Sequence, residues 1–245
     1  MPVFFIASHA IGNHTVTITG PLLQHLRASL RTQPGEEIRV TDDRRRRYRI
    51  RVNEVDRSAL RGKILSEEHG PAPSLIPVLL GQALVKGDRM DWIVQKTTEL
   101  GIAALVPLIS RRAVSRPRPE RLASQQQRWQ RIALEAAQQA ERWEVPAVDP
   151  FQDVTDFFNR HAPSPDGKLI LSERWAGEPL HSISLPHSGG ILLAVGPEGG
   201  WAEDELQVAA GAGFKMITLG PRILRAETAA LAAVSVLQSR LGEMG

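Results

Sequence analysis

Short apolar runs alternate with helical stretches along the last two thirds of the chain. The apolar runs lie at 78–84, 104–110, 168–173, 191–196 and 216–220, and helical patterns lie at 87–101, 120–143, 153–160, 202–213 and 227–242. A strand that is apolar on both faces has to be covered on both sides, as in a parallel sheet with crossover helices. The pattern therefore predicts an α/β domain with a mostly parallel sheet and helices on both faces.

The first 70 residues follow a different pattern. Short strand-like runs lie at 3–7, 15–20, 37–42, 47–52 and 60–66, with one helical stretch at 21–30. This spacing is typical of a small β-barrel. Residues 67–77 then contain a glycine and three prolines, which disfavour regular structure. We therefore expect two domains, a barrel at 1–72 and the α/β domain at 73–245.

The chain of 245 residues contains no cysteine. This excludes disulfides, thiolate metal sites and cysteine nucleophiles. The seven histidines show no HxxxH or HExxH spacing, so no metal site is expected. The N-terminal residues lack the pattern of a signal peptide, and no apolar run is long enough to span a bilayer. We expect a soluble cytoplasmic protein without a membrane contact.

Positive charge is concentrated near the N-terminus. Residues 1–72 contain 12 lysines and arginines against 8 acidic residues. Many of these arginines lie in the predicted hairpin TDDRRRRYRIRV, and they include Arg44, Arg45, Arg46, Arg47 and Arg49. Such a cluster favours binding to nucleic acid, because neutralising phosphates releases counterions. The alternative is a solvated turn and strand edge whose charge prevents aggregation.

The strand at 191–196 ends in the glycine-rich sequence Gly196-Pro197-Glu198-Gly199-Gly200. Glycines allow a ligand to approach the backbone closely and also permit sharp turns. The sequence matches neither a GxxxxGK[ST] phosphate loop nor GxGxxG, which argues against an ATP or dinucleotide enzyme. The alternative is a tight turn between a strand and a helix, but a turn alone does not require the Pro-Glu pair.

A second polar loop, LGPRILRAETA at 219–229, lies between the last predicted strand and the last helix. Ligands of α/β proteins bind where strands end. Arg222 and Arg225 flank Ile223 and Leu224, so this loop is a candidate ligand loop. Thr228, taken alone, is more simply a residue that satisfies free amides at the start of a helix.

The helical stretch KGDRMDWIVQKTTELG at 86–101 has Asp88 at the N-cap position and a glycine at its C-terminal end. Met90, Ile93 and Val94 belong to its apolar face. Lys86 and Arg89 remain available for solvent, RNA or a partner.

Together these stretches resemble the 16S rRNA uracil-N3 methyltransferase family, a branch of the SPOUT class. The matching motifs are KGDRMDWIVQKTTELG, RIALEAAQQAERWEVP, KLILSER, LAVGPEGGW and LGPRILRAETA, within residues 78–240. The resemblance implies a PUA-like N-terminal barrel, a trefoil knot in the α/β domain and a homodimer. It also implies S-adenosylmethionine as cofactor and 16S rRNA of the small ribosomal subunit as substrate. The sequence departs from the family pattern at Ala140-Glu141 and at Trp143.

The resemblance also assigns residues. The ends of three strands would bind the cofactor, through Leu171, Ser172, Val195, Gly196, Pro197, Glu198, Gly199, Leu219, Gly220, Ile223, Leu224 and Thr228. The charge pattern, rather than the resemblance, indicates RNA contacts at Lys86, Arg89 and the hairpin arginines Arg44, Arg45, Arg46, Arg47 and Arg49. The catalytic candidates are Arg225, then Arg222, for stabilising a uracil anion, and Glu198 as a proton acceptor or a residue that holds its loop.

Two other functions fit the same motifs. Another methyltransferase of this class, acting on ribose or on a different base, would share the cofactor loops, because nothing in those loops selects the substrate. A non-enzymatic RNA-binding protein of ribosome assembly would need the arginines but no cofactor site.

Overall fold

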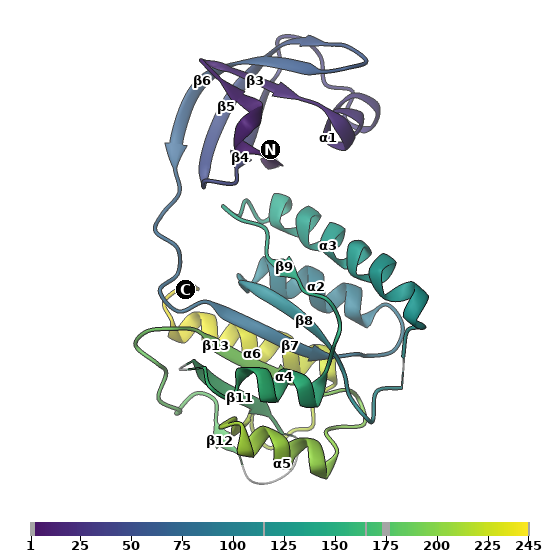
Figure 1. The fold of residues 1–245 in the computed structure, drawn as a ribbon. Helices are drawn as coiled ribbons and strands as arrows, with labels where there is room; N and C mark the ends of the chain where they lie inside the picture. Colours follow the sequence, from purple (N-terminus) through teal and green to yellow (C-terminus); the bar gives the residue numbers. More distant parts are fainter. Residues whose placement is uncertain (1–2, 115, 165, 173–176, 245) are drawn as a thin grey trace. The chain divides into compact units, whose positions relative to one another are not determined.

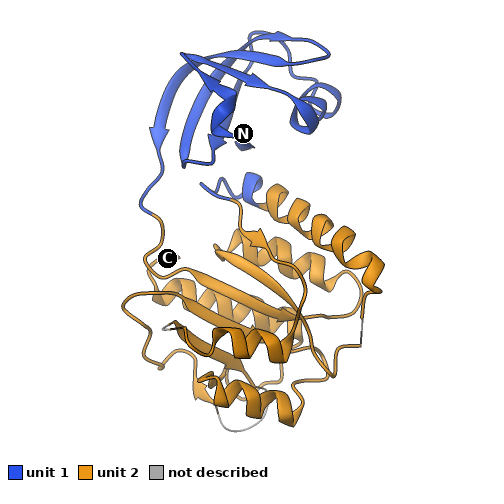
Figure 2. Ribbon diagram, in the orientation of Figure 1, with its two compact units in different colours: residues 1–72, 137–144 blue, residues 73–136, 145–245 orange. Residues whose placement is uncertain are grey.

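The protein is described by a computed structural model that covers residues 3–114, 116–164, 166–172 and 177–244 (Figure 1). Its backbone contacts divide the chain into two compact units (Figure 2). Unit 1 contains residues 1–72 and 137–144, and unit 2 contains residues 73–136 and 145–245. The sequence pattern placed 137–144 in the second domain, whereas the contacts place this segment in unit 1.

Unit 1 contains a six-stranded sheet with the strand order β1-β4-β5-β6-β3-β2. The strands are β1 (Val3–Ile6), β2 (Ile11–Gly12), β3 (Thr15–Ile18), β4 (Glu37–Asp42), β5 (Arg46–Val55) and β6 (Leu60–His69). β1 runs parallel to β4, and the other pairs are antiparallel. Alternate residues of β5 point into the core, where Tyr48, Ile50 and Val52 are buried. This alternation is what made the strand recognisable in the sequence.

The predicted helix at 21–30 is divided in two. It consists of α1 (Gly20–Gln24) and a π-helical turn (His25–Ser29). Leu23 and Leu26 from these two pieces join the core of unit 1.

The sheet of unit 2 is parallel throughout its described pairs, with the order β10-β8-β7-β13-β11-β14-β12, and β9 pairs with β8. Its strands are β7 (Val78–Ala83), β8 (Ala104–Ile109), β9 (Ala147–Val148), β10 (Gln152–Asp153), β11 (Gly167–Leu171), β12 (Glu178–Pro179), β13 (Ile191–Val195) and β14 (Lys215–Thr218). β11 lies between β13 and β14. The carboxyl ends of these three strands therefore meet at one edge of the sheet.

Helices cover both faces of this sheet (Figure 1). They are α2 (Arg89–Glu99), α3 (Leu122–Gln139, whose last residues belong to unit 1), α4 (Val154–His161), α5 (Glu203–Gly211) and α6 (Ala226–Arg240). Residues of α2, α3 and α6 form one apolar cluster with the sheet, and residues of α4 and α5 form the other. Along β13, Ile191 and Leu193 join the first cluster, whereas Leu192 and Ala194 join the second. This division explains why the strand is apolar at every position.

The α/β prediction is thus confirmed. The strands β9, β10 and β12 were not predicted, because two residues are too few to show a periodic pattern. Among the described residues, none of the helices combines the length and the apolar character that crossing a membrane would need.

Candidate active site

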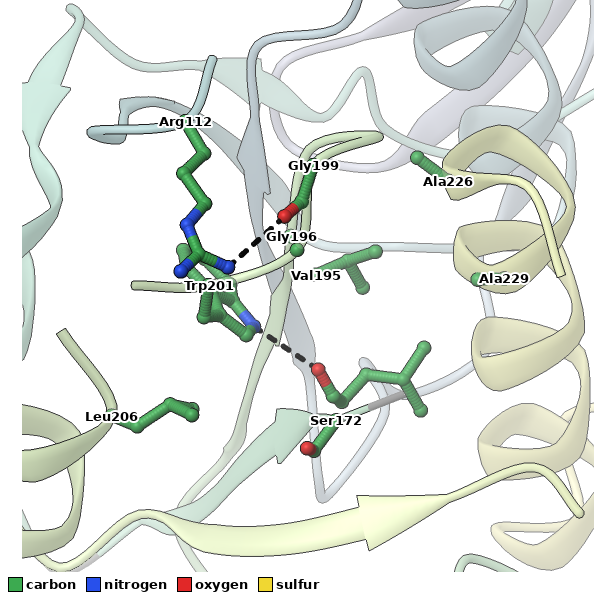
Figure 3. Close-up of a pocket in the computed structure, with 11 residues that line it drawn as sticks. Arg112, Ser172, Val195, Gly196, Gly199, Trp201, Leu206, Ala226 and Ala229 are labelled. Atoms are coloured by element: carbon green, nitrogen blue, oxygen red, sulfur yellow. Dashed lines mark hydrogen bonds between the residues drawn. The ribbon is translucent and has the colours of Figure 1, made fainter. Parts of the chain in front are cut away.

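The ends of β11 and β13 and the first two turns of α6 enclose a cavity of about 110 Å³ (Figure 3). Arg112 and Leu206 complete its wall from the loop after β8 and from α5. The lining residues are Arg112, Leu171, Ser172, Val195, Gly196, Gly199, Gly200, Trp201, Leu206, Ala226 and Ala229. Much of this wall consists of glycine, alanine and exposed backbone, so the cavity can accept a flat or aliphatic group close to the main chain.

Two hydrogen bonds fix the shape of the glycine-rich loop. The indole Nε1 of Trp201 donates to the carbonyl oxygen of Leu171 at 3.0 Å, and Arg112 Nη1 donates to the carbonyl oxygen of Gly199 at 3.3 Å (Figure 3). A Cβ atom at Gly196 would lie 3.2 Å from the Trp201 ring, and one at Gly199 would lie 3.2 Å from Arg112. A side chain at either glycine would thus require its neighbour to shift, so both glycines favour the close packing of this loop.

The loop after β14 forms a second, smaller cavity of about 30 Å³. It is lined by Leu171, Ser172, Thr218, Leu219, Gly220, Arg222, Ile223, Leu224 and Ala229. Because Leu171, Ser172 and Ala229 line both cavities, a ligand larger than either one can extend across the pair. The structure thus brings together all three predicted strand ends.

Glu198 is held by the first residue of α2 and by Lys86 in the loop that precedes this helix. Its Oε1 accepts hydrogen bonds from the backbone N–H of Lys86 at 3.0 Å and from Arg89 Nη1 at 2.9 Å. The Arg89 guanidinium also lies 3.7 Å from Glu227, in the first turn of α6. Arg89 therefore connects the glycine-rich loop to α6. Holding the loop is one of the two roles predicted for Glu198, whereas an ion pair with Glu198 was not predicted for Arg89.

The second carboxylate oxygen of Glu198 and that of Glu227 are buried and have no hydrogen-bond donor among the described residues. One guanidinium thus serves two carboxylates. This arrangement holds the loop in place through Oε1 of Glu198, and it leaves Oε2 without a hydrogen bond among the described residues.

The remaining predicted ligand residues lie at different distances from the cavities. Pro197 is buried and lines neither cavity, and Thr228 is exposed and lines neither. Arg222 lines the smaller cavity, whereas Arg225 is an exposed residue at the N-cap of α6 and lines neither cavity. Of the two arginines, only Arg222 thus contributes to the wall of a cavity.

Sequence reasoning missed several lining residues, among them Arg112, Trp201 and Ala229. Trp201 directly follows the glycine-rich loop, so its position could have suggested it. Arg112 comes from a loop more than 80 residues earlier, and no local pattern connects the two.

The arginine hairpin of unit 1 differs from the expected solvent-exposed patch. Asp42 is buried at the end of β4 and accepts hydrogen bonds from the backbone N–H groups of Arg44 and Arg46, both at 2.9 Å, and from Arg46 Nε. Burial alone would raise the pKa of Asp42, but the hydrogen bonds from Arg46 and Arg44 outweigh it and hold the pKa below its usual value. Arg44 and Arg49 are the exposed members of the predicted RNA-binding set in this hairpin.

Arg47 is buried and binds the segment 137–144. Its Nη2 donates to the backbone oxygens of Glu141 at 2.8 Å and Arg142 at 3.0 Å, and its guanidinium lies 3.9 Å from the centre of the Trp143 ring. Arg39 pairs with the Glu141 carboxylate, and Arg45 with Glu144 at 2.6 Å. Glu141 and Trp143, where the chain departs from the family pattern, therefore attach this segment to the hairpin. A phosphate cannot reach Arg47 while it makes these contacts.

No group of three or more histidine, cysteine, aspartate or glutamate side chains that could hold a metal ion occurs in the described part of the chain.

Comparisons with known proteins agree with this site. A family model described as an RNA methyltransferase domain matches residues 72–238. A protein named ribosomal RNA small subunit methyltransferase E from Synechocystis is 34% identical over 96% of this chain and 77% of its own length. One of the same name from Mycobacterium tuberculosis is 33% identical over 88% of this chain and 84% of its own length.

A solved structure of similar fold supports the same relation. It is a ribosomal RNA small subunit methyltransferase E from Neisseria gonorrhoeae, bound to S-adenosyl methionine. It is 37% identical, covers 98% of both chains and superposes with a TM-score of 0.87.

Proposed function

Because the chain belongs to this family of RNA methyltransferases, we propose that it transfers a methyl group from S-adenosylmethionine to N3 of a uridine in 16S rRNA of the small ribosomal subunit. The observation that supports this most is the meeting of three strand ends, β11, β13 and β14, around two cavities with shared walls. The named relatives act on ribosomal RNA by their names, and the Neisseria protein binds the same cofactor.

The residues present fit this cofactor. Gly196, Gly199, Ala226 and Ala229 form a wall of backbone and small side chains that suits a purine ring and an aliphatic chain. In this proposal the cofactor lies across both cavities and contacts Leu171, Ser172, Val195, Leu219, Gly220 and Leu224. When bound, it supplies an electrophilic methyl group on sulfur.

The chain's own residues position the uracil against the cofactor and stabilise the negative charge that develops on its ring. Uracil N3 carries a proton, so methylation requires the anion or a developing negative charge on the ring. A guanidinium near O2 or O4 favours that anion and lets solvent take the proton. Arg222 has this role in our proposal, because it lines the smaller cavity, and Arg225 is the second candidate. Glu198 holds the loop through Arg89.

Three further features belong to the same proposal. Unit 1 would be a PUA-like barrel that contacts RNA through its exposed arginines, unit 2 would contain a trefoil knot, and the enzyme would be a cytoplasmic homodimer. The order β7-β13-β11-β14, in which later strands are inserted among earlier ones, is compatible with a knotted connection. Sedimentation of the purified protein tests the dimer.

The activity is tested by incubating the purified protein with S-adenosylmethionine and small subunits from a strain that lacks the gene. Mass spectrometry of the digested RNA should then show N3-methyluridine. If the methyl group is found on ribose or on another base, the proposed N3 methylation is wrong and the protein is a different RNA methyltransferase. Absence of any transfer, together with no heat of cofactor binding in calorimetry, would leave a non-enzymatic RNA-binding protein.

The role of arginine is tested by comparing two variants. Arg222→Ala should lower kcat on the order of 10²-fold at nearly unchanged cofactor affinity, because it removes a charge that acts on the developing anion. Arg222→Lys should restore part of the rate. If Arg225→Ala lowers kcat more than Arg222→Ala does, Arg225 stabilises the uracil anion instead. If both alanine variants keep full activity, neither arginine stabilises it.

A further inference from the structure

A second arginine-rich segment follows β8 at the same edge of the sheet as the cofactor loops. Residues 111–121 include five arginines and a single acidic residue, Glu120. The backbone N–H of Arg111 donates to the buried Glu205 at 2.8 Å, and the Arg111 guanidinium pairs with Asp204 at 2.8 Å. Both acidic residues belong to α5, so the start of the segment is fixed to unit 2.

The later arginines of the segment are not neutralised. The guanidinium of Arg116 donates to the backbone oxygens of Ser110 and Arg111, and it has no carboxylate partner among the described residues. Arg118 and Arg121 are exposed, and their guanidinium groups make no ion pair or hydrogen bond within the described ranges. Arg118 and Arg121 are therefore two exposed cations without a carboxylate partner in the described part of the chain.

Arg121 lines a cavity of about 390 Å³ that is separate from the two cavities of the proposed cofactor site, and Arg118 follows Pro117, which also lines it. Its floor is apolar and contains Leu84, Val85, Met90 and Trp129, all buried. The other lining residues, which we call the rim, are Gly87, Asp88, Asp91, Pro117, Arg121, Gln125 and Arg128, and five of them have polar or charged side chains. A volume of several hundred Å³ with an apolar floor and a few polar groups is typical of a small-molecule or nucleoside site.

Two of the rim residues are free to bind a ligand. The half-buried carboxamide of Gln125 makes no hydrogen bond with another described residue, and neither does the Arg121 guanidinium. Arg128, in contrast, pairs with Asp91, and Asp91 also accepts a hydrogen bond from Trp129 at 3.0 Å. Among the polar lining residues, the amide of Gln125 and the cation of Arg121 are therefore groups that remain available to a ligand.

The cavity is adjacent to the cofactor site through two connections. Arg112, in the same segment, lines the cofactor cavity and binds Gly199. Gly87, on the rim of the larger cavity, follows Lys86, whose N–H is bound to Glu198 of the glycine-rich loop. A ligand in the larger cavity would therefore lie beside the residues that hold the cofactor.

We propose that Arg118, Arg121 and this cavity bind single-stranded RNA next to the methylated nucleotide. Phosphates would pair with the two guanidinium groups, and one base would enter the cavity and hydrogen-bond to Gln125. Single-stranded RNA is recognised through exposed bases and phosphates in this way, and extrusion of the target base would leave its neighbours accessible. The proposal rests on the proposed RNA substrate and extends it by a second contact surface, in unit 2.

The double variant Arg118→Ala/Arg121→Ala tests this surface. The matched control is Arg131→Ala/Arg160→Ala, which removes two exposed arginines from α3 and α4 that line none of the cavities described. Binding is measured by fluorescence anisotropy with a labelled single-stranded oligoribonucleotide at several salt concentrations. Transfer to small subunits gives KM and kcat, and calorimetry gives the cofactor affinity.

The test variant should bind RNA about 10-fold more weakly, and its salt slope should fall by about 1.4, since each phosphate contact of a single strand contributes about 0.7. KM for the RNA should rise, with unchanged kcat and cofactor affinity. Gln125→Ala should weaken binding without a change in slope, because the carboxamide carries no charge.

Equal losses in the test and control variants would overturn the proposal, and so would an unchanged affinity and slope in the test variant. Tighter binding of a labelled poly-glutamate peptide than of the oligoribonucleotide would assign the surface to an acidic protein instead. If the wild-type protein transfers no methyl group, the proposed reaction fails, but the binding and salt data still decide whether this surface holds RNA.

Discussion

Two regions of the molecule contain many arginines and use them differently. In the hairpin of unit 1, Arg39 pairs with Glu141, Arg46 with Asp42, and Arg51 with Glu37. In the segment after β8, Arg118 and Arg121 have no such partner among the described residues. The hairpin uses most of its charge to hold its own unit together, whereas the segment keeps charge available for a ligand.

The difference follows from the acidic residues that surround each region. The hairpin has Asp42 in its turn and Glu37 and Glu67 on the neighbouring strands, and the segment 137–144 adds Glu141 and Glu144. The segment after β8 contains only Glu120, and the neighbouring Asp204 and Glu205 of α5 bind Arg111 at its start rather than Arg118 or Arg121. The number of arginines alone therefore does not identify a binding surface, because neighbouring carboxylates can neutralise them.

The largest expected effect concerns the buried arginine of the hairpin. Arg47→Ala should lower the free energy of unfolding of unit 1 by about 2–4 kcal/mol, because it leaves two backbone oxygens without their donor and removes the contact with Trp143. Hydrogen exchange of the β4 and β5 amides measures this loss within unit 1. Arg44→Ala, at an exposed position of the same turn, is the control and should change it by less than about 0.5 kcal/mol. Equal protection in the two variants would mean that Arg47 is not structural.

A smaller effect is expected at Asp42. The pKa of this buried carboxyl lies below its ordinary value, since the hydrogen bonds from Arg46 and Arg44 outweigh the effect of burial. The carboxylate therefore stabilises unit 1 above pH 3.8, the ordinary pKa, and this contribution is lost as the pH falls through the lowered value. Asp42→Asn should cost about 1–2 kcal/mol near pH 7 and should reduce the loss of stability in acid.

Exchange or unfolding measured between pH 6 and pH 2 tests this linkage. The wild-type and Asp42→Asn proteins should approach each other in stability as the pH falls. A constant difference in the free energy of unfolding over this range would show that the pKa of Asp42 is the same in the folded and the unfolded protein.

Much of the fold was predictable because its signals are local. The strand at 37–42 and the helix within 87–101 follow from the side-chain pattern of a few neighbouring residues. The loops at the ends of β13 and β14 were recognisable because glycine, proline and charge interrupt apolar runs there. The residues that determine each of these elements are neighbours in the sequence, so the elements can be predicted from the sequence alone.

The contacts that assemble the site were not predictable in the same way. Arg89 and Glu198 are 109 residues apart, and their pairing depends on the order of β7 and β13 in the sheet. The burial of Arg47 depends on the segment 137–144, which is 94 residues away. Such pairs leave no periodic pattern in the sequence. The identity of a charged residue also does not tell whether its partner is RNA or another residue of the same chain.

The smallest expected effect completes the comparison of the two arginine-rich regions. Arg121→Ala should change the free energy of unfolding of unit 2 by less than about 0.5 kcal/mol, because its guanidinium makes no contact with a carboxylate that folding would lose. Chemical denaturation of the full chain, with exchange of the α3 amides as a local probe, measures it. A loss as large as that in Arg47→Ala would mean that Arg121 has a structural partner in solution. The two regions would then use arginine in the same way, and the unmatched charge after β8 could no longer be taken as charge kept for RNA.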